Sequence, residues 1–117
     1  MLFDVTEMQR INDQRGHEFG NQVLKDIERR LKSSFGFASV IRLRGDEFLV
    51  TQPNFDLIKL NAKAGVVAQI ITHKFGIELA WGSGAGATGK QAHRAAATDL
   101  FEKRRRSCKW ETKYPSH

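Results

Sequence analysis

The stretch FASVIRLRGDEFLVT, residues 37–51, contains two apolar runs on either side of Arg-Gly-Asp-Glu at residues 44–47. Both runs have the β-branched and aromatic content of strands, and the four residues between them suit a hairpin turn. We expect Gly45 to supply the positive φ that a tight turn of this kind needs. The stretch therefore predicts a β-hairpin that carries two acidic residues, Asp46 and Glu47, at its turn.

Apolar periodicity predicts the elements around this hairpin. Positions that recur at intervals of three and four residues indicate amphipathic helices, and short apolar runs between turn residues indicate strands. In chain order we expect a strand at 2–5, a helix around 23–31, strands at 37–43 and 48–51, a helix at 57–71, a strand at 75–81 and a helix at 91–106. This order predicts an α+β fold in which helices cover a mixed central sheet.

Three carboxylates occupy the ends of predicted strands. Asp4 stands near the end of the first strand, and Asp46 and Glu47 stand in the hairpin. If these strands are neighbours in the sheet, the three carboxylates meet at one edge. Such a group suits Mg²⁺, which prefers oxygen ligands and also binds substrate phosphates. Acidic residues are also common in turns, so spacing alone leaves a metal site and a plain turn as alternatives.

The composition is that of one globular domain. The chain has 117 residues, 40% of them hydrophobic, and a formal net charge of +6 that favours an anionic partner. The single cysteine, Cys108, excludes an internal disulfide and indicates a reducing, cytoplasmic compartment. No apolar run reaches the ~20 residues of a membrane span, and no signal peptide is recognisable. We expect one domain over residues 1–110 and a C-terminal tail over 111–117.

Short motifs extend outward from the hairpin in a fixed order. They are the acidic strand end at Asp4, Ile-Asn-Asp at 11–13, Gly-His at 16–17, Gly-Asn at 20–21 and Arg-Gly-Asp-Glu-Phe at 44–48. With these motifs the chain resembles the GGDEF family of bacterial diguanylate cyclases, strongly over residues 2–50. The resemblance implies a palm-like fold related to nucleotide cyclases. It also implies that two GTP molecules are condensed to cyclic di-GMP across a homodimer, with Mg²⁺ as cofactor.

The resemblance further implies a role for individual residues. Asp4 and Glu47 would be carboxylate ligands of Mg²⁺, and the carbonyl of Val5 would be a third ligand. Asp46, the other catalytic acid beside Glu47, would help to deprotonate the attacking 3′-hydroxyl. Five further residues would bind the nucleotide: Asn12, Asn21, Arg44, Gly45 and Arg104.

Several positions depart from the family pattern. Arg44 replaces the first signature glycine, Thr6 replaces a second acid, Gln9 replaces a lysine and Asn21 replaces an aspartate that accepts guanine protons. The usual N-terminal segment with its Asp-x-Leu-Thr pattern is also missing. Two functions therefore remain open, namely a weakly active cyclase and a catalytically degenerate domain that senses nucleotides or binds a protein partner.

Two other features suggest different functions. The basic residues 103–106 are compatible with nucleic-acid binding, but they equally complement the dipole at a helix end, and regular aromatic platforms for bases are lacking. Residues 84–90 match the glycine and lysine spacing of a phosphate-binding P-loop. Gln91 stands where that motif needs Ser or Thr for Mg²⁺, which favours a flexible loop instead. GTP or cyclic di-GMP remains the expected ligand.

Overall fold

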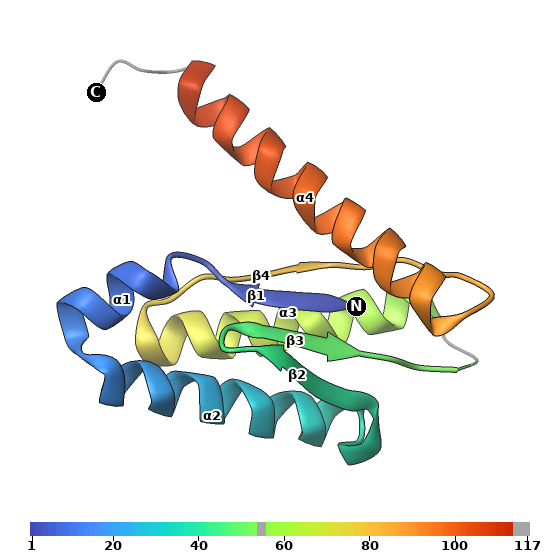
Figure 1. Ribbon diagram of the computed structural model, residues 1–117, viewed down its shortest axis with the longest axis horizontal. Coiled ribbons are helices and arrows are strands. Elements are labelled where there is room, and N and C mark those ends of the chain that lie inside the picture. The colour runs from blue at the N-terminus through green and yellow to red at the C-terminus, as the bar shows by residue number, and fades with distance from the viewer. Residues whose placement is uncertain (54–55, 114–117) are drawn as a thin grey trace.

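The computed structural model describes residues 1–53 and 56–113, apart from the side chains of Arg44 and of residues 107–113. The α+β class and the hairpin are confirmed (Figure 1). The elements are β1 (Leu2–Val5), α1 (Met8–Arg15), α2 (His17–Phe35), the 3-10 turn η1 (Phe37–Ser39), β2 (Val40–Arg44), β3 (Glu47–Val50), α3 (Leu57–Phe75), β4 (Leu79–Gly82) and α4 (Gly89–Lys113).

Within the described residues, four strands form one sheet in the order β2-β3-β1-β4, and every neighbouring pair is antiparallel. The prediction of a mixed sheet is wrong for a topological reason. The helices α1 and α2 bring β2 back parallel to β1, but β3 then returns through the hairpin and inserts between them. As a result Asp4 pairs with Glu47 on one side and with Ala80 on the other.

Helices cover the two faces of the sheet unequally (Figure 1). The helices α2 and α3 pack on one face, where Phe3 and Phe48 are fully buried in the main core. The helix α4 crosses the other face over β1 and β4, with a smaller core of Leu2, Ala96 and Leu100. Because side chains alternate along a strand, Asp4 lies on the same face as Leu2, toward α4.

The helix α1 was not predicted, because only Met8 and Ile11 of its eight residues are buried apolar side chains. The chain enters it through Glu7, a residue other than glycine with a positive φ of 59°. The helix ends at Gly16, whose φ is 89°. The chain therefore changes direction directly after β1 and begins to run back along the main core.

Several boundaries also differ from the prediction. Residues 37–39 form the turn η1, so β2 starts at Val40. The helix α3 continues through Phe75 to Gly76, whose φ of 68° ends it, and β4 therefore begins only at Leu79. The helix α4 extends to Lys113, into the segment that we expected to be a tail. In the described part of the chain, no helix is long and apolar enough to cross a bilayer.

Candidate functional site

The centre of the site is the carboxylate of Asp4, whose side chain is 15% exposed. Its Oδ2 accepts a hydrogen bond of 2.9 Å from Nη1 of Arg104 in α4. Its Oδ1 is buried and has no hydrogen-bond partner among the described atoms. Burial raises the pKa of Asp4, and the negative charges of Asp46 and Glu47 act in the same direction, while Arg104 opposes them.

The hairpin turn lies directly beside this carboxylate. The carbonyl oxygen of Asp46 accepts a hydrogen bond of 3.2 Å from the N–H of Val5. Asp4 and Glu47 are register partners on adjacent strands. The structure therefore brings all three predicted carboxylates to one edge of the sheet, close enough for Asp46 and Glu47 to shift the pKa of Asp4.

Gly45 does not adopt the positive φ that we predicted. The turn is instead accommodated by a register irregularity between Arg42 and Arg44. The guanidinium of Arg42 donates two hydrogen bonds, of 3.1 and 2.7 Å, to the carbonyl oxygen of Gly45. A Cβ on Gly45 would meet nothing within 4 Å, so open space lies beside the turn. The side chain of Arg44, a predicted nucleotide contact, lies outside the described residues.

Few potential metal ligands lie at this edge of the sheet. Among the described side chains, no three His, Cys, Asp or Glu residues converge closely enough to form a metal-binding group by themselves. Asp4 and Glu47 offer two carboxylates, and Val5 offers a backbone carbonyl. This set suits Mg²⁺, which usually binds one or two protein carboxylates and completes its shell with water and substrate phosphates. The unpartnered Oδ1 of Asp4 is an acceptor that such an ion would satisfy.

Arg104 reaches the site from the opposite end of the chain, 100 residues after Asp4. Its side chain is 42% exposed, so the guanidinium is open to solvent on one side. Although we predicted a nucleotide contact for Arg104, the structure places its guanidinium on the carboxylate that we expected to hold the metal. A protein cation thus partly neutralises the acidic edge.

The two predicted guanine contacts lie on the first two helices. Asn12, in α1, is partly buried, and its Oδ1 lies against Gly20 so closely that a Cβ there would come within 2.1 Å. Asn21 is exposed near the start of α2. Glycine at position 20 is therefore what lets Asn12 keep its present position beside α2.

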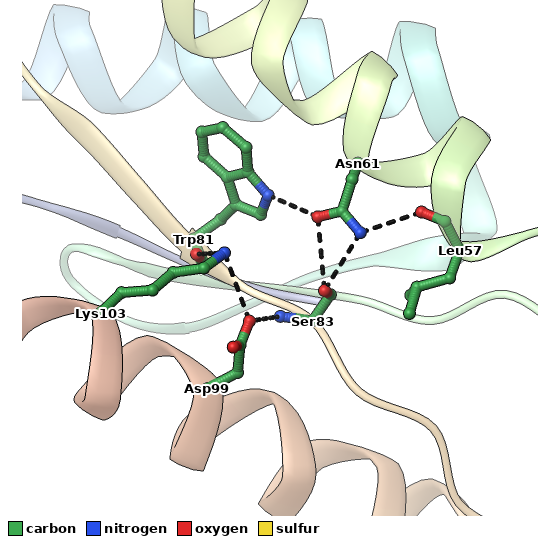
Figure 2. A network of polar contacts seen from close by, with 6 residues as sticks. All are labelled: Leu57, Asn61, Trp81, Ser83, Asp99 and Lys103. Carbon is green, nitrogen blue, oxygen red and sulfur yellow. Dashed lines mark hydrogen bonds and ion pairs between the residues drawn. The ribbon is translucent and has the colours of Figure 1, made fainter.

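A polar network between α3, β4 and α4 was not anticipated from the sequence (Figure 2). Nε1 of Trp81 donates to Oδ1 of Asn61 at 3.0 Å, and Nδ2 of Asn61 donates to the hydroxyl of Ser83 at 3.2 Å. The N–H of Ser83 donates to Oδ2 of Asp99 at 2.8 Å. Lys103 contacts the same Oδ2 at 3.3 Å and donates to the carbonyl oxygen of Trp81 at 3.1 Å. The spacing of Asp99 and Lys103, four residues apart, was the available signal.

The basic cluster in α4 is engaged within the chain. Lys103 pairs with Asp99, Arg104 pairs with Asp4 and Arg105 pairs with Glu102 at 2.8 Å. These contacts offset part of the positive charge that suggested a nucleic-acid contact.

Comparison with known proteins assigns the chain to a family. The family model described as "Diguanylate cyclase, GGDEF domain" matches residues 1–82, which include β1, the hairpin and β4. The chain belongs to the GGDEF family. The matched region ends before α4, so Arg104 and Asp99 themselves lie outside the part that the family model covers.

Similar proteins come from several bacteria. The uncharacterised protein YhcK of Bacillus subtilis is 42% identical over 60 residues, which are 50% of this chain and 17% of that protein. The cyclic di-GMP phosphodiesterase NbdA of Pseudomonas aeruginosa is 41% identical over 51 residues, which are 43% of this chain and 6% of that protein. The GGDEF domain thus spans less than a fifth of the length of these curated relatives.

Two solved structures share the fold over 90% of the GGDEF domain. The active GGEEF domain of a diguanylate cyclase from Vibrio cholerae has a TM-score of 0.66 at 21% identity, with 74% of that chain covered. An EAL/GGDEF domain protein from M. capsulatus has a TM-score of 0.64 at 27% identity, with 76% of that chain covered. These likenesses agree with the palm-like α+β fold implied by the sequence.

Proposed function

We propose that this GGDEF domain binds GTP together with Mg²⁺ at the edge formed by Asp4 and the hairpin. We further propose that two copies of the domain condense two GTP molecules to cyclic di-GMP, with one pyrophosphate released from each GTP. The observation that carries the proposal is the position of Asp4 between Glu47 and Arg104, with one buried carboxylate oxygen left unpartnered. A buried acceptor without a donor is unfavourable, so a cation that arrives with the nucleotide has a place to bind.

Each residue at this edge would have a distinct part in that reaction. Asp4, Glu47 and the Val5 carbonyl would hold Mg²⁺, which neutralises phosphate charge in phosphoryl transfer. Asp46 would accept the proton of the attacking 3′-hydroxyl. Arg104 would turn from Asp4 to the triphosphate, because a guanidinium binds phosphate oxygens with charge-assisted hydrogen bonds. The open space beside Gly45 would admit the phosphates near the backbone of the turn.

The remaining nucleotide contacts belong to the base. Asn12 and Asn21 would hydrogen-bond the guanine edge, and Arg44 would lie beside the phosphates as the variant residue of an Arg-Gly-Asp-Glu-Phe signature. Because an amide offers one acceptor and one donor where a carboxylate offers two acceptors, Asn21 would weaken the preference for guanine. The proposal places the domain in the cytoplasm, where GTP is available.

A second function is favoured by the same ion pair. With Arg104 on Asp4, a protein cation already neutralises the principal metal carboxylate, as in a degenerate domain that senses GTP or binds a partner without turnover. Thr6, at the position of a second family acid, lowers the negative charge available to a metal in the same way.

The two functions are separated by measuring binding and product together. Calorimetry would determine the affinity for GTP with and without Mg²⁺, and mass spectrometry would detect products from equimolar GTP and ATP. Cyclic di-GMP made by the wild type and lost in Glu47→Gln supports the cyclase, with Glu102→Gln as a control for the same charge change on an exposed helix surface. Mg²⁺-dependent binding without product supports the sensing module. Failure to bind GTP would overturn both the cyclase and the GTP-sensing module.

A further inference from the structure

The helix α4 packs closely against β4 of the sheet. A Cβ on Gly82 of β4 would lie 2.2 Å from the carbonyl oxygen of Ala96 and 2.4 Å from the nitrogen of Leu100. The absence of a side chain at Gly82 thus lets the backbones of β4 and α4 approach directly. Apolar contacts of Leu2 with Ala96 and Leu100 complete this packing.

Close packing alone does not fix where along its axis a helix sits, because apolar contacts are not directional. The polar contacts of Asp99 and Lys103 are directional. Asp99 accepts from the N–H of Ser83, and Lys103, one helical turn later, donates to the carbonyl of Trp81. Both partners are backbone groups of β4 or of the residue after it, which cannot move by changing a rotamer. Two such contacts fix the translation and the rotation of α4 together.

The pKa of Asp99 agrees with a stabilising contact between its carboxylate and β4. Burial by itself would raise the pKa of Asp99, but the N–H of Ser83 and the charges of Lys103 and Arg106 hold that pKa below its ordinary value. The folded protein therefore favours the ionised form of Asp99 over the protonated form more strongly than water does. Lys103 also lies 5.3 Å from the centre of the Trp81 ring, a cation–π distance.

The network continues behind the strand to α3. The indole of Trp81 and the hydroxyl of Ser83 both contact the amide of Asn61, so the stretch of β4 that receives α4 is itself held from the other side (Figure 2). The backbone groups that Asp99 and Lys103 contact are thus anchored to α3.

We propose that Asp99 and Lys103 are positioning residues, which hold α4 in the register that places the guanidinium of Arg104 on Asp4. Arg104 directly follows Lys103 and lies five residues after Asp99, so a shift of the helix by even one residue, about 1.5 Å along the axis and 100° around it, would remove Arg104 from Asp4. The link to nucleotide binding rests on the function proposed above. The effect of Asp99 and Lys103 on the Asp4–Arg104 pair does not depend on that function.

A double-mutant cycle tests the control of the pair without any ligand. Urea denaturation of Asp4→Asn, Arg104→Gln and the double variant measures their coupling in the unfolding equilibrium constant. We expect a coupling of about threefold or more in the wild-type background and close to none in the Asp99→Ala background, which lacks an acceptor for the N–H of Ser83. In a Glu102→Gln background the coupling should stay as in the wild type, because Glu102 contacts only Arg105 among the described polar groups.

The outcomes decide between positioning and simple stabilisation. If Asp99 only stabilises the fold, Asp99→Ala lowers stability and leaves the coupling unchanged, which would overturn the proposal. A wild type without coupling would overturn it as well. Should Asp99→Ala not fold, Lys103→Gln removes the contact with Trp81 and keeps the bond between Asp99 and Ser83, so the same cycle can be run in that background.

Affinity for GTP with Mg²⁺ tests the functional consequence separately. Asp99→Ala should weaken binding about fivefold when Arg104 is present and have no further effect in an Arg104→Gln background. An equal loss in both backgrounds would contradict positioning through Arg104. If the wild type binds no GTP, the proposed function fails, while the denaturation cycle still decides whether Asp99 controls the Asp4–Arg104 pair.

Discussion

The close approach of α4 to β4 predicts that Gly82→Ala is strongly destabilising. The added Cβ would lie 2.2 Å from the Ala96 oxygen, 2.4 Å from the Leu100 nitrogen and 2.7 Å from the Leu100 Cβ, whereas ordinary contacts between heavy atoms are about 3.5–4.0 Å. The first two atoms belong to the backbone and cannot rotate away, so α4 must retreat by more than about 1 Å. Overpacking of cores usually costs about 1–3 kcal/mol, and we expect this variant at the upper end, near 3 kcal/mol.

Urea denaturation followed by circular dichroism would measure this loss of stability. In thermal denaturation, Tm should fall by about 10 °C. Gly89→Ala is the matched control, because Gly89 lies at the start of the same helix and a Cβ there would meet nothing within 4 Å. That variant should be neutral or more stable by up to about 1 kcal/mol. A Gly82→Ala protein within about 0.5 kcal/mol of the wild type would refute the argument from close packing.

Three further predictions concern charged groups and the base site. Arg104→Gln should weaken the affinity for GTP with Mg²⁺ about tenfold in calorimetry, whereas Arg105→Gln, which loses only an exposed pair with Glu102, should bind like the wild type. Because burial raises the pKa of Asp4, its contribution to stability is present below the unfolded pKa of about 3.9 and is lost as pH rises through the folded value. Asp4→Asn should therefore be more stable than the wild type near neutral pH. Urea denaturation of both proteins, at a pH below and a pH above the folded pKa of Asp4, checks the sign of this stability difference. Gly20→Ala should displace Asn12, whose Oδ1 would lie 2.1 Å from the new Cβ, and should lower the preference for GTP over ATP in competition binding. An unchanged preference would remove Asn12 from the base site.

The hairpin and the two long helices of the main core could be predicted from local patterns. Periodic apolar positions in α2 and α3 and the short polar turn at 44–47 are signals that neighbouring residues carry by themselves. The helix α1 lacked such a signal because its apolar content is low. The sheet was misjudged for a different reason, since the order of strands does not say which strand inserts between two others.

The candidate site was predictable as a set of acids and not as a set of contacts. The proximity of Asp4 to the hairpin follows once β1 and β3 are neighbours. The partner of Arg104 could not be inferred, because no local pattern connects residues 100 positions apart. The contacts of Asp99 and Lys103 with backbone groups of β4 depend on how closely Gly82 lets the helix approach, which is a property of packing in three dimensions.

The contact between Asp4 and Arg104 has a consequence for folding. It closes a loop of 100 residues in a chain of 117, and the entropy lost on closing a loop grows with its length. Contacts of such high sequence separation are made after the local hairpin and helices, and they are lost as soon as the terminal helix detaches. A partly unfolded molecule that retains β1 and the hairpin would keep the acids and lose the cation. Occupancy of the pair thus reports that α4 is docked on β1.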